Sequence, residues 1–497
     1  MNAAASKIDA DAAYRAGLRA LDTGDEIEVL PLLDAALDTA PDDARLWQVK
    51  ALLHRSLEEL APSVVAFARA ATLAPQDATI AHGHAHAALE AGLPAAPLFE
   101  RALTLAKDRG PVVQGIAAAL VVENGPSAAI DRLHAELRVN PDWLVGHWLL
   151  SRLRWTEGDR DGFAASIEAA VKRAPRSVVH WRQYIFILMH GGLHEQALAV
   201  IDRARASAGP DIAFLFDEAA CLTESWQLDA AERAFAALPR TSDMSVAIHA
   251  VRHLLRLQRP EEAAARAEPL MKRGDAHMIM PYLSIIWRLL GDSRFAWLEG
   301  DDRFVRAYDL RQKLDCWPKL AETLRALHVT AGQPLEQSVR GGTQTDGPLF
   351  SRIEPEICAL RQTIAETVAE HVAQLPPPEA GHPLLAPRRD RRIRFTGSWS
   401  IRLQGSGHHT NHVHPGGWLS SALYLVVPLE TADTARKAGW LTFGQPQVEL
   451  GLDLPPVRMI QPKEGHLTLF PSTMWHGTTP FSEGERMTVA FDVGVPC

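Results

Sequence analysis

Apolar residues recur at helical spacing from about residue 11 to about residue 298, in an Ala- and Leu-rich stretch with few β-branched runs. This pattern predicts a succession of amphipathic helices. Prolines follow several of these stretches at nearly constant intervals: Pro41 and Pro75 are 34 residues apart, Pro141 and Pro175 are 34 apart, and Pro210 follows 35 residues later. A proline there ends one helix and fits the first turn of the next. The sequence therefore predicts repeated helix pairs.

A period of 34 residues resembles the tetratricopeptide (TPR) repeat, in which each unit is one helix pair. Counting back from Pro75 places Trp47 early in a first helix, with Phe67 and Ala70 in a second. The resemblance is poor at residues 76–140, where Pro111 breaks the spacing, and again beyond residue 239. About eight pairs would fill the span at that period.

Repeats of this kind stack into a superhelix with a concave surface. Aromatic residues at helical spacing could line that surface for a peptide, or could fill the core between helices, which is their commoner use and the interpretation that we favour. They are Trp143, Trp148, Trp155, Trp181 and Tyr184.

Residues 300–390 are transitional in character. Residues 340–345 read as a Gly-rich loop, and because no Lys follows they do not match a phosphate-binding loop. Apolar residues at helical spacing predict one amphipathic helix over residues 353–374, which a proline cluster at 376–378 ends.

After residue 392 the sequence pattern changes from that of helices to that of β-strands. Short β-rich segments separated by Gly, Pro and Asn turns predict an all-β sandwich or barrel. They cover residues 393–395, 399–403, 421–427, 439–443, 465–470 and 487–493. We therefore expect a disordered tail at 1–10, TPR-like helical repeats at 11–299, a connecting and supporting segment at 300–390 and a β domain at 391–497.

Bulk composition excludes some classes of function. A chain of 497 residues should hold at least two domains, and a net charge of −9 argues against binding nucleic acid through its phosphates. The four cysteines show no CxxC spacing, so neither a zinc site nor a disulfide framework is indicated. No long apolar stretch predicts a signal peptide or membrane span, so a cytoplasmic location without membrane contact is the expectation.

Candidate chemistry is concentrated near the C-terminal end. His412 and His414 are closely spaced on one segment, His476 follows far along the chain, and Arg486 lies ten residues beyond it. Such histidines can close around one metal ion if the chain folds back, which the adjoining strand-like sequence allows. Imidazoles on one face of an ion, with the other face open, are typical of non-haem iron(II) sites.

The order of these motifs resembles the iron(II)- and 2-oxoglutarate-dependent oxygenases, and in particular the bacterial members that carry TPR repeats upstream. It runs from His412-x-His414 through Gly-x-Leu-x-Phe (439–443) and Gly-x-Leu-x-Leu-Phe-Pro-Ser (465–472) to His476 and Arg486-x-Thr488. The resemblance covers residues 390–497 well and 320–390 loosely. It implies a double-stranded β-helix, which is a jelly-roll variant.

The resemblance also assigns roles to residues. His412 would be the first iron ligand and His476 the distal one, with Arg486 and Thr488 holding the far carboxylate of 2-oxoglutarate. A guanidinium suits that task because it can donate two parallel hydrogen bonds. Tyr424 would reach the same carboxylate, as in prolyl-hydroxylase-like members, and Arg402 would face the pocket by analogy.

The chain departs from the commoner family pattern at one ligand. The better-known members have a carboxylate two residues after the first histidine, where this chain has His414. His414 could complete a three-histidine site, which we favour, or water could fill the place as in the aspartyl/asparaginyl hydroxylases, whose domain layout is similar. His408 and His409 are expected beside the ligands rather than among them.

The resemblance implies a dioxygenase that uses Fe(II), O2 and the co-substrate 2-oxoglutarate to hydroxylate a C–H bond. The leading hypothesis is a protein or peptide substrate, recruited by the concave surface of the TPR-like repeats. One alternative is a small-molecule or lipid-linked substrate, and another is a binding scaffold with an inert jelly roll. Nothing in the sequence names the substrate.

Overall fold

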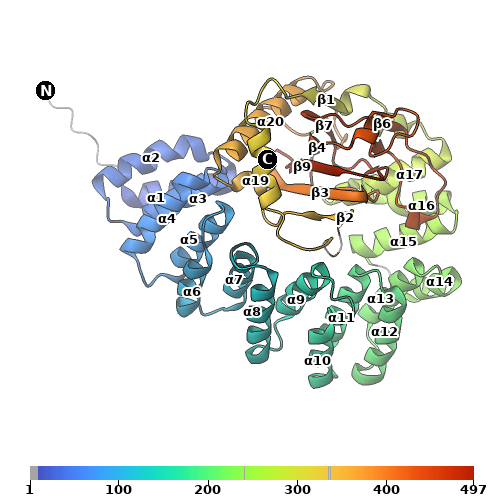
Figure 1. Cartoon of the computed structure of the whole chain (residues 1–497). Helices are drawn as coiled ribbons and strands as arrows, with labels where there is room; N and C mark the ends of the chain where they lie inside the picture. Colours follow the sequence, from blue (N-terminus) through green and yellow to red (C-terminus); the bar gives the residue numbers. More distant parts are fainter. Residues whose placement is uncertain (1–8, 240, 334, 336, 497) are drawn as a thin grey trace. The chain divides into compact units, whose positions relative to one another are not determined.

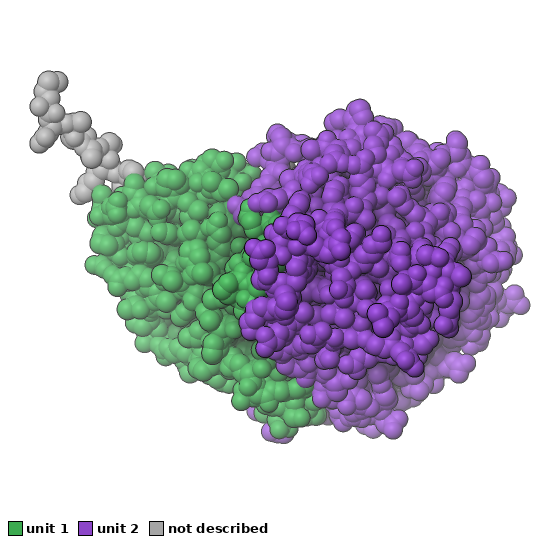
Figure 2. Space-filling model, turned by 45° about the horizontal axis from the view of Figure 1, so that its top comes forward, with its two compact units in different colours: residues 1–136, 346–364, 497 green, residues 137–345, 365–496 purple. Residues whose placement is uncertain are grey.

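The structure, a computed structural model, describes residues 9–239, 241–333, 335 and 337–496. The chain forms two compact units, shown in green and purple in Figure 2. One unit contains residues up to 136 together with 346–364, and the other contains residues 137–345 and 365–496. The tail predicted at residues 1–10 lies outside the described residues, except for Asp9 and Ala10.

The described residues from 10 to 299 form antiparallel helix pairs, which confirms the predicted helical repeats (Figure 1). The first helices of successive pairs begin 32 to 36 residues apart, and the series continues through residues 76–140 and beyond residue 239. The helices are α1 Ala10–Thr23, α2 Glu26–Thr39, α3 Ala44–Ser56, α4 Leu60–Leu73, α5 Ala78–Glu90, α6 Ala96–Leu105, α7 Gly110–Glu123, α8 Pro126–Val139, α9 Leu144–Thr156, α10 Ala165–Arg173, α11 Val178–His190, α12 His194–Ala208, α13 Ile212–Glu224, α14 Leu228–Ala237, α15 Met244–Arg256, α16 Pro260–Ala267, α17 Met280–Leu290 and α18 Arg294–Glu299.

Helix starts repeat because their caps repeat. Asp9, Asp43 and Asp77 stand immediately before three successive first helices, and each side chain accepts a hydrogen bond from a backbone N–H of the first turn. Such caps satisfy N–H groups that have no partner inside the helix. Pro41 lies in the turn before its cap rather than in the first helical turn, where we had expected it, because helix α3 begins only at Ala44.

The β part consists of two antiparallel sheets, which confirms the predicted helical-then-β fold class. The larger sheet has the strand order β1-β7-β4-β9-β3-β2 and the smaller has β6-β5-β8. The strands are β1 Arg306–Asp309, β2 Val339–Gln344, β3 Phe395–His409, β4 Leu419–Val426, β5 Leu441–Phe443, β6 Arg458–Ile460, β7 His466–Pro471, β8 His476–Thr478 and β9 Glu485–Val493, and the helices of this region are α19 Trp317–Ala326 and α20 Pro355–Ala373.

The prediction of a loop at residues 340–345 was wrong, since β2 pairs with β3 along this segment. The register shifts between Arg340 and Gly342, and Gly341 sits there with φ +68°. A bulge with a glycine in the left-handed region lets a glycine-rich strand stay in a ladder. Tertiary pairing thus overrides the local turn signal. Both edge strands of the larger sheet, β1 and β2, come from the segment predicted as connecting.

The last helix pairs share a hydrophobic core with the sheet part, across the position near residue 299 where a boundary was predicted. Arg288 donates hydrogen bonds to the carbonyls of Gly444 and Pro455, at 2.9 and 2.6 Å. The indole of Trp475 donates to the Pro281 carbonyl at 2.8 Å. Buried members of this core include Val251, Leu255, Leu283, Ile286, Trp287 and Leu298 from the helices, and Leu450 and Trp475 from the sheet part.

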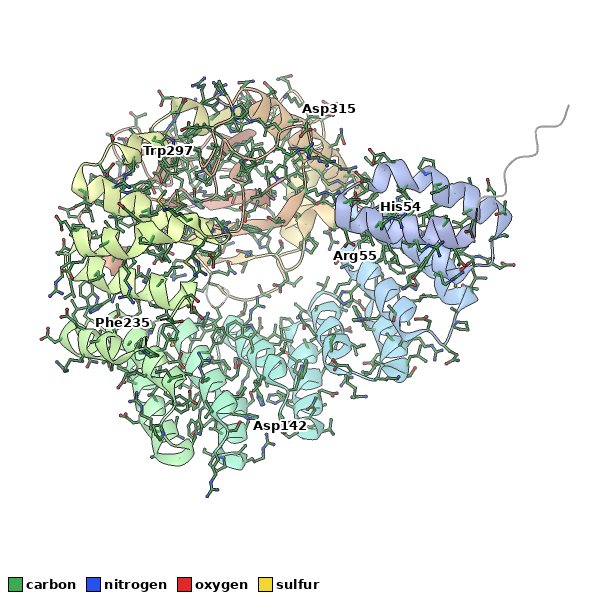
Figure 3. All side chains as sticks on the ribbon, turned by 180° about the vertical axis from the view of Figure 1, so that it is seen from behind. His54, Arg55, Asp142, Phe235, Trp297 and Asp315 are labelled. Atoms are coloured by element: carbon green, nitrogen blue, oxygen red, sulfur yellow. The ribbon has the colours of Figure 1, made fainter. Side chains whose placement is uncertain are left out.

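Helix α18 makes a further contact with the segment that precedes β3. The Trp297 indole donates to Glu379 at 2.6 Å, and the Trp297 carbonyl lies 3.1 Å from His382 Nε2 (Figure 3 labels Trp297). Among the described residues, no helix has both the length and the apolar character needed to cross a bilayer.

Candidate metal and carboxylate site

Two of the three candidate ligands face each other across a β-bridge. His412 and His476 exchange both backbone hydrogen bonds, with N–O distances of 2.8 and 3.0 Å. Residues directly opposite in an antiparallel pair carry their side chains on the same face. The imidazole centroids accordingly lie 4.2 Å apart. The fold-back anticipated from the sequence is therefore present.

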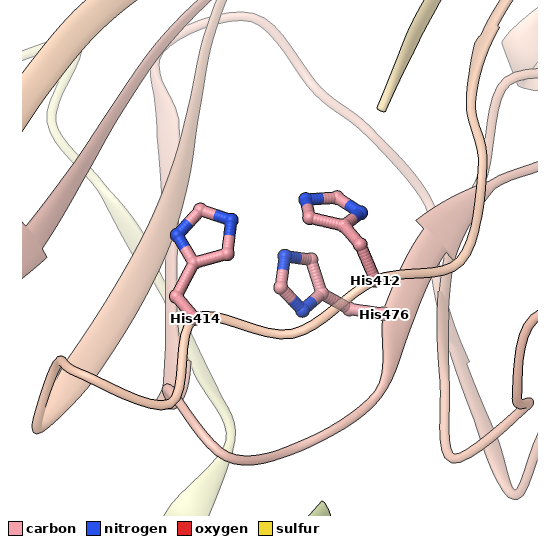
Figure 4. A group of neighbouring side chains, drawn as sticks. All are labelled: His412, His414 and His476. Carbon is pink, nitrogen blue, oxygen red and sulfur yellow. The ribbon is translucent and has the colours of Figure 1, made fainter. Parts of the chain in front are cut away.

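His414 joins them because it lies two residues beyond His412 in an extended segment, where alternate side chains share a face. Its backbone N–H donates to the Ser472 carbonyl at 2.9 Å, which keeps the segment alongside the chain leading to His476. One ligand atom from each of the three rings lies within 4.8 Å of the other two, so the group could hold a metal ion. Figure 4 shows the three rings side by side.

Each of the three imidazoles has an acceptor at Nδ1. His412 Nδ1 lies 2.8 Å from the Thr410 carbonyl, and His476 Nδ1 lies 3.0 Å from the Met474 carbonyl. His414 Nδ1 lies 2.7 Å from a carboxylate oxygen of Asp492. These acceptors favour the tautomer with hydrogen on Nδ1, which leaves the Nε2 lone pair for a metal. Acceptors of this kind also fix ring orientation at metal centres.

Burial, together with neighbouring imidazoles, lowers the pKa of His412 to about 3 and holds the pKa of His476 well below its usual value. Both rings are therefore neutral at neutral pH. Metal ligation requires the neutral imidazole, so these surroundings suit a ligand role.

The three histidines line a cavity of about 310 Å³, and the guanidinium of Arg486 is a buried cation in its wall. The other lining residues include Thr488 of β9, Gln344, Trp399 and Phe470. The guanidinium of Arg486 is 2% exposed and donates from Nη1 to the Gly439 carbonyl at 3.0 Å, whereas its Nε has no partner among the described residues. Burial lowers the pKa of Arg486 from its ordinary value.

Tyr424 lies beside this guanidinium, whose central carbon is 5.2 Å from the centre of the phenol ring. Its hydroxyl is buried and, among the described residues, makes no hydrogen bond. Tyr424 and Thr488 are directly paired between β4 and β9, so both side chains share the Arg486 face of the sheet. A buried cation without a carboxylate partner is costly, and an anionic ligand would satisfy these polar atoms. The residues present therefore fit the far carboxylate of 2-oxoglutarate.

The structure does not bring Arg402 to this cavity. Ile401 and Leu403 pair with Thr488 and Arg486 on the inner face, so Arg402 points to the opposite face of β3. There its Nε donates to Glu485 at 2.6 Å. Arg402 is therefore not among the residues that we propose for the co-substrate.

His409 lines the cavity and its Nδ1 lies 3.1 Å from the Ser338 hydroxyl, whereas His408 is not among the lining residues.

Sequence reasoning missed Asp492 and Ser420. The Ser420 hydroxyl donates at 2.5 Å to the Asp492 oxygen that does not contact His414. A signal was present in the sequence. Polar or small residues alternate with apolar ones along β9, from Arg486 through Thr488 and Ala490 to Asp492, and thus mark one polar face.

Comparisons with known proteins find different matches for the helical part and for the C-terminal part of the chain. Solved structures similar to the helical part include a tetratricopeptide repeat protein from Parabacteroides merdae (16% identity, 46% of this chain and 90% of that chain, TM-score 0.29). Another is YrrB, described as a TPR protein with an unusual peptide-binding site, with 19% identity, 37% of this chain and 95% of that chain covered, and a TM-score of 0.24. A third is the type IV pilus biogenesis factor PilW, with 15% identity, 40% of this chain and 92% of that chain covered, and a TM-score of 0.29. No curated protein matches the chain.

Residues 397–492 match the family described as "Putative 2OG-Fe(II) oxygenase". This range contains the three histidines, Arg486 and Asp492. The C-terminal part of the chain thus carries a domain of the 2-oxoglutarate- and Fe(II)-dependent oxygenase family, preceded by TPR-like helical repeats.

Proposed function

We propose that this protein is a 2-oxoglutarate- and Fe(II)-dependent hydroxylase that acts on a C–H bond of a polypeptide recruited by its helical repeats. One observation carries the proposal: three imidazoles, each with an acceptor at Nδ1, share a cavity of about 310 Å³ with a buried guanidinium that forms no ion pair among the described residues. This combination supports a site for a metal and a dicarboxylate together. An inert jelly roll gives no reason to keep an unpaired cation buried.

In this proposal His412, His414 and His476 hold Fe(II), which when bound supplies the centre at which O2 and 2-oxoglutarate react. The protein's own part is to position the reactants. Arg486, with Thr488 and Tyr424, would bind the far carboxylate and so place the keto acid against the metal face. Asp492 and the carbonyls of residues 410 and 474 would hold the ligating rings in place.

The test is formation of succinate from 2-oxoglutarate by the full chain with and without Fe(II), measured by mass spectrometry. We expect iron-dependent succinate from the wild type and none from His412→Ala. Comparing the host proteome with and without the protein for a mass gain of 16 Da would then identify the substrate. No succinate from iron-loaded wild type in the presence of that proteome would contradict the proposal and favour the scaffold alternative.

A further inference from the structure

Side chains from helices α15 and α17 hold the loop between β5 and β6. Arg252 of α15 donates a hydrogen bond to the amide oxygen of Gln447 at 2.9 Å. Gln258, two residues beyond α15, donates to the Gly451 carbonyl at 3.2 Å. Arg288 of α17 holds both ends of the same loop through the bonds described above. All these residues belong to one compact unit, so the last helix pairs fix the loop at several positions.

The same loop contacts the chain next to the candidate ligands. Asn411 immediately precedes His412, and its Nδ2 donates to the Pro446 carbonyl at 3.0 Å. Its Oδ1 lies so close to Gly477, the residue after His476, that a Cβ at position 477 would be 2.2 Å away. Asn411 therefore touches both ligand segments. Its own position depends on Pro446, one residue before the loop position that α15 holds.

Arg252 also reaches the second ligand segment, by way of helix α17. Its Nη1 lies 3.3 Å from the hydroxyl of Tyr282. The Tyr282 ring packs edge-on against Trp475, with centroids 5.7 Å apart and an interplanar angle of 84°. Trp475 immediately precedes His476, and its carbonyl accepts a hydrogen bond from the Gly444 N–H at 2.7 Å. One guanidinium of the helical repeats is thus linked to the segments of both ligands.

The charges around Arg252 show what distinguishes it from its neighbour. Arg252 and Arg256 share the single carboxylate of Glu224, at 2.9 and 2.5 Å. The side chain of Arg256 is fully buried, and the other two are 11% exposed. One guanidinium is enough to neutralise this carboxylate, and burying a further cation is costly. The contacts with Gln447 and Tyr282 are what the second guanidinium adds.

We propose that Arg252 is a positioning residue for the candidate metal site. It acts on the His412 segment through Gln447 and the loop, and on the His476 segment through Tyr282. This rests on the metal site of the proposed function. Partners that hold metal ligands in place typically contribute about 10- to 100-fold to metal affinity. Because Arg252 acts through intermediate residues, we expect the lower end of this range.

The test is anaerobic titration of the full chain with Co(II), followed by ligand-field absorption, which needs no turnover. Arg252→Met should bind Co(II) about tenfold more weakly and with a shifted spectrum. This variant leaves Glu224 paired with Arg256, so no buried carboxylate loses its only cation. Gln447→Leu should show part of the loss. The double variant should bind no more weakly than Arg252→Met, because the second change breaks a contact that is already lost.

Two further variants separate positioning from general stability. Gln447→Glu keeps an acceptor for Arg252 and gives the second guanidinium a carboxylate of its own, so it should keep wild-type Co(II) affinity. Arg182→Met is the matched control, because Arg182 of α11 pairs with Asp217 of α13 at 3.0 Å and so joins two helices of the repeats. It too should keep wild-type affinity. Circular dichroism melting checks that each variant folds.

Unchanged Co(II) affinity and spectrum in Arg252→Met would overturn the inference, and so would an equal loss in Arg182→Met. If Arg252→Met does not fold, wild-type affinity in Gln447→Leu overturns it instead. A wild type that binds no Co(II) would overturn both the inference and the metal site of the proposed function. Co(II) binding that depends on Arg252, in a chain that forms no succinate, would support the inference and contradict the hydroxylase.

Discussion

The hydrogen bond from His414 Nδ1 to Asp492 offers a direct test of whether His414 is a ligand. At 2.7 Å it joins an imidazole to a carboxylate whose second oxygen accepts from Ser420. Asp492→Asn keeps the size of the side chain and can keep both hydrogen bonds, with the amide oxygen accepting from His414 and the NH2 donating to the Ser420 hydroxyl. What the variant removes is the negative charge behind the imidazole.

The expected loss follows from the difference between hydrogen bonds. Those to a charged group contribute about 1.5–3 kcal/mol and neutral ones about 0.5–1.5 kcal/mol, so the variant should lose about 1–1.5 kcal/mol of metal binding. This corresponds to about a tenfold weaker affinity. We would measure it by anaerobic titration with Fe(II) and with Co(II), whose ligand-field absorption also reports the coordination geometry without any turnover.

Asp453→Asn is the matched control, since Asp453 is exposed on the β5–β6 loop. Its metal affinity should equal that of the wild type. If water rather than His414 completes the site, both Asp492→Asn and His414→Ala should also keep wild-type affinity and an unchanged Co(II) spectrum. That result would refute the three-histidine hypothesis. A loss in His414→Ala without any change in Asp492→Asn would refute only the role of the carboxylate.

Other predictions concern the metal, the co-substrate and acid stability. His476→Ala should lose bound Fe(II), measured as metal per chain, and an unchanged content would exclude the ligand assignment. Arg486→Ala should weaken 2-oxoglutarate binding about tenfold or more while metal binding survives. Arg486→Lys should fall in between, because it keeps the charge but not the two parallel hydrogen bonds of the guanidinium. Calorimetry on the metal-loaded protein measures the 2-oxoglutarate affinity of both variants. Burial lowers the pKa of His371 to about 4, so below pH 6.5 the unfolded chain takes up a proton that the folded protein excludes, and stability falls as pH falls. His371→Gln should reduce this loss by about 1.4 kcal/mol per pH unit between pH 6 and 5 in urea unfolding, and an unchanged slope would contradict the assignment.

Local patterns were sufficient to predict the helical repeats, helix α20 and the strands β3, β4, β5, β7 and β9, but not helix α19 or the strands β1, β2, β6 and β8. The 34-residue period and the amphipathic stretch at 353–374 are properties of single segments, and so are the alternating runs that became β3, β4, β7 and β9. The edge strands β1 and β2 were missed because pairing with strands distant in the sequence, rather than their own local sequence, makes these segments extended. Gly341 and Gly342 carry a turn signal, and only the ladder with β3 makes this segment extended.

The candidate site shows the same division. His412, His476 and Arg486 could be proposed from their order along the chain, since the family pattern specifies it. Strand alternation, once the register with β9 is known, removes Arg402 from the pocket. Asp492 could have been anticipated from the polar face of β9, but its contact with His414 spans 78 residues and requires the fold.

The dependence of the site on the repeats is the feature that no linear pattern carried. Trp475, immediately before His476, is 1% exposed and sits in the core built by α15–α18, with its indole bonded to Pro281 of α17. Removing residues 1–300, an obvious way to ask whether the repeats recruit substrate, would also remove this support. The indole would lose its apolar surroundings and its acceptor next to a candidate ligand. Loss of turnover in such a truncation therefore cannot be assigned to recruitment, whereas Val179→Asp alters an exposed position of α11 and leaves the core around Trp475 intact.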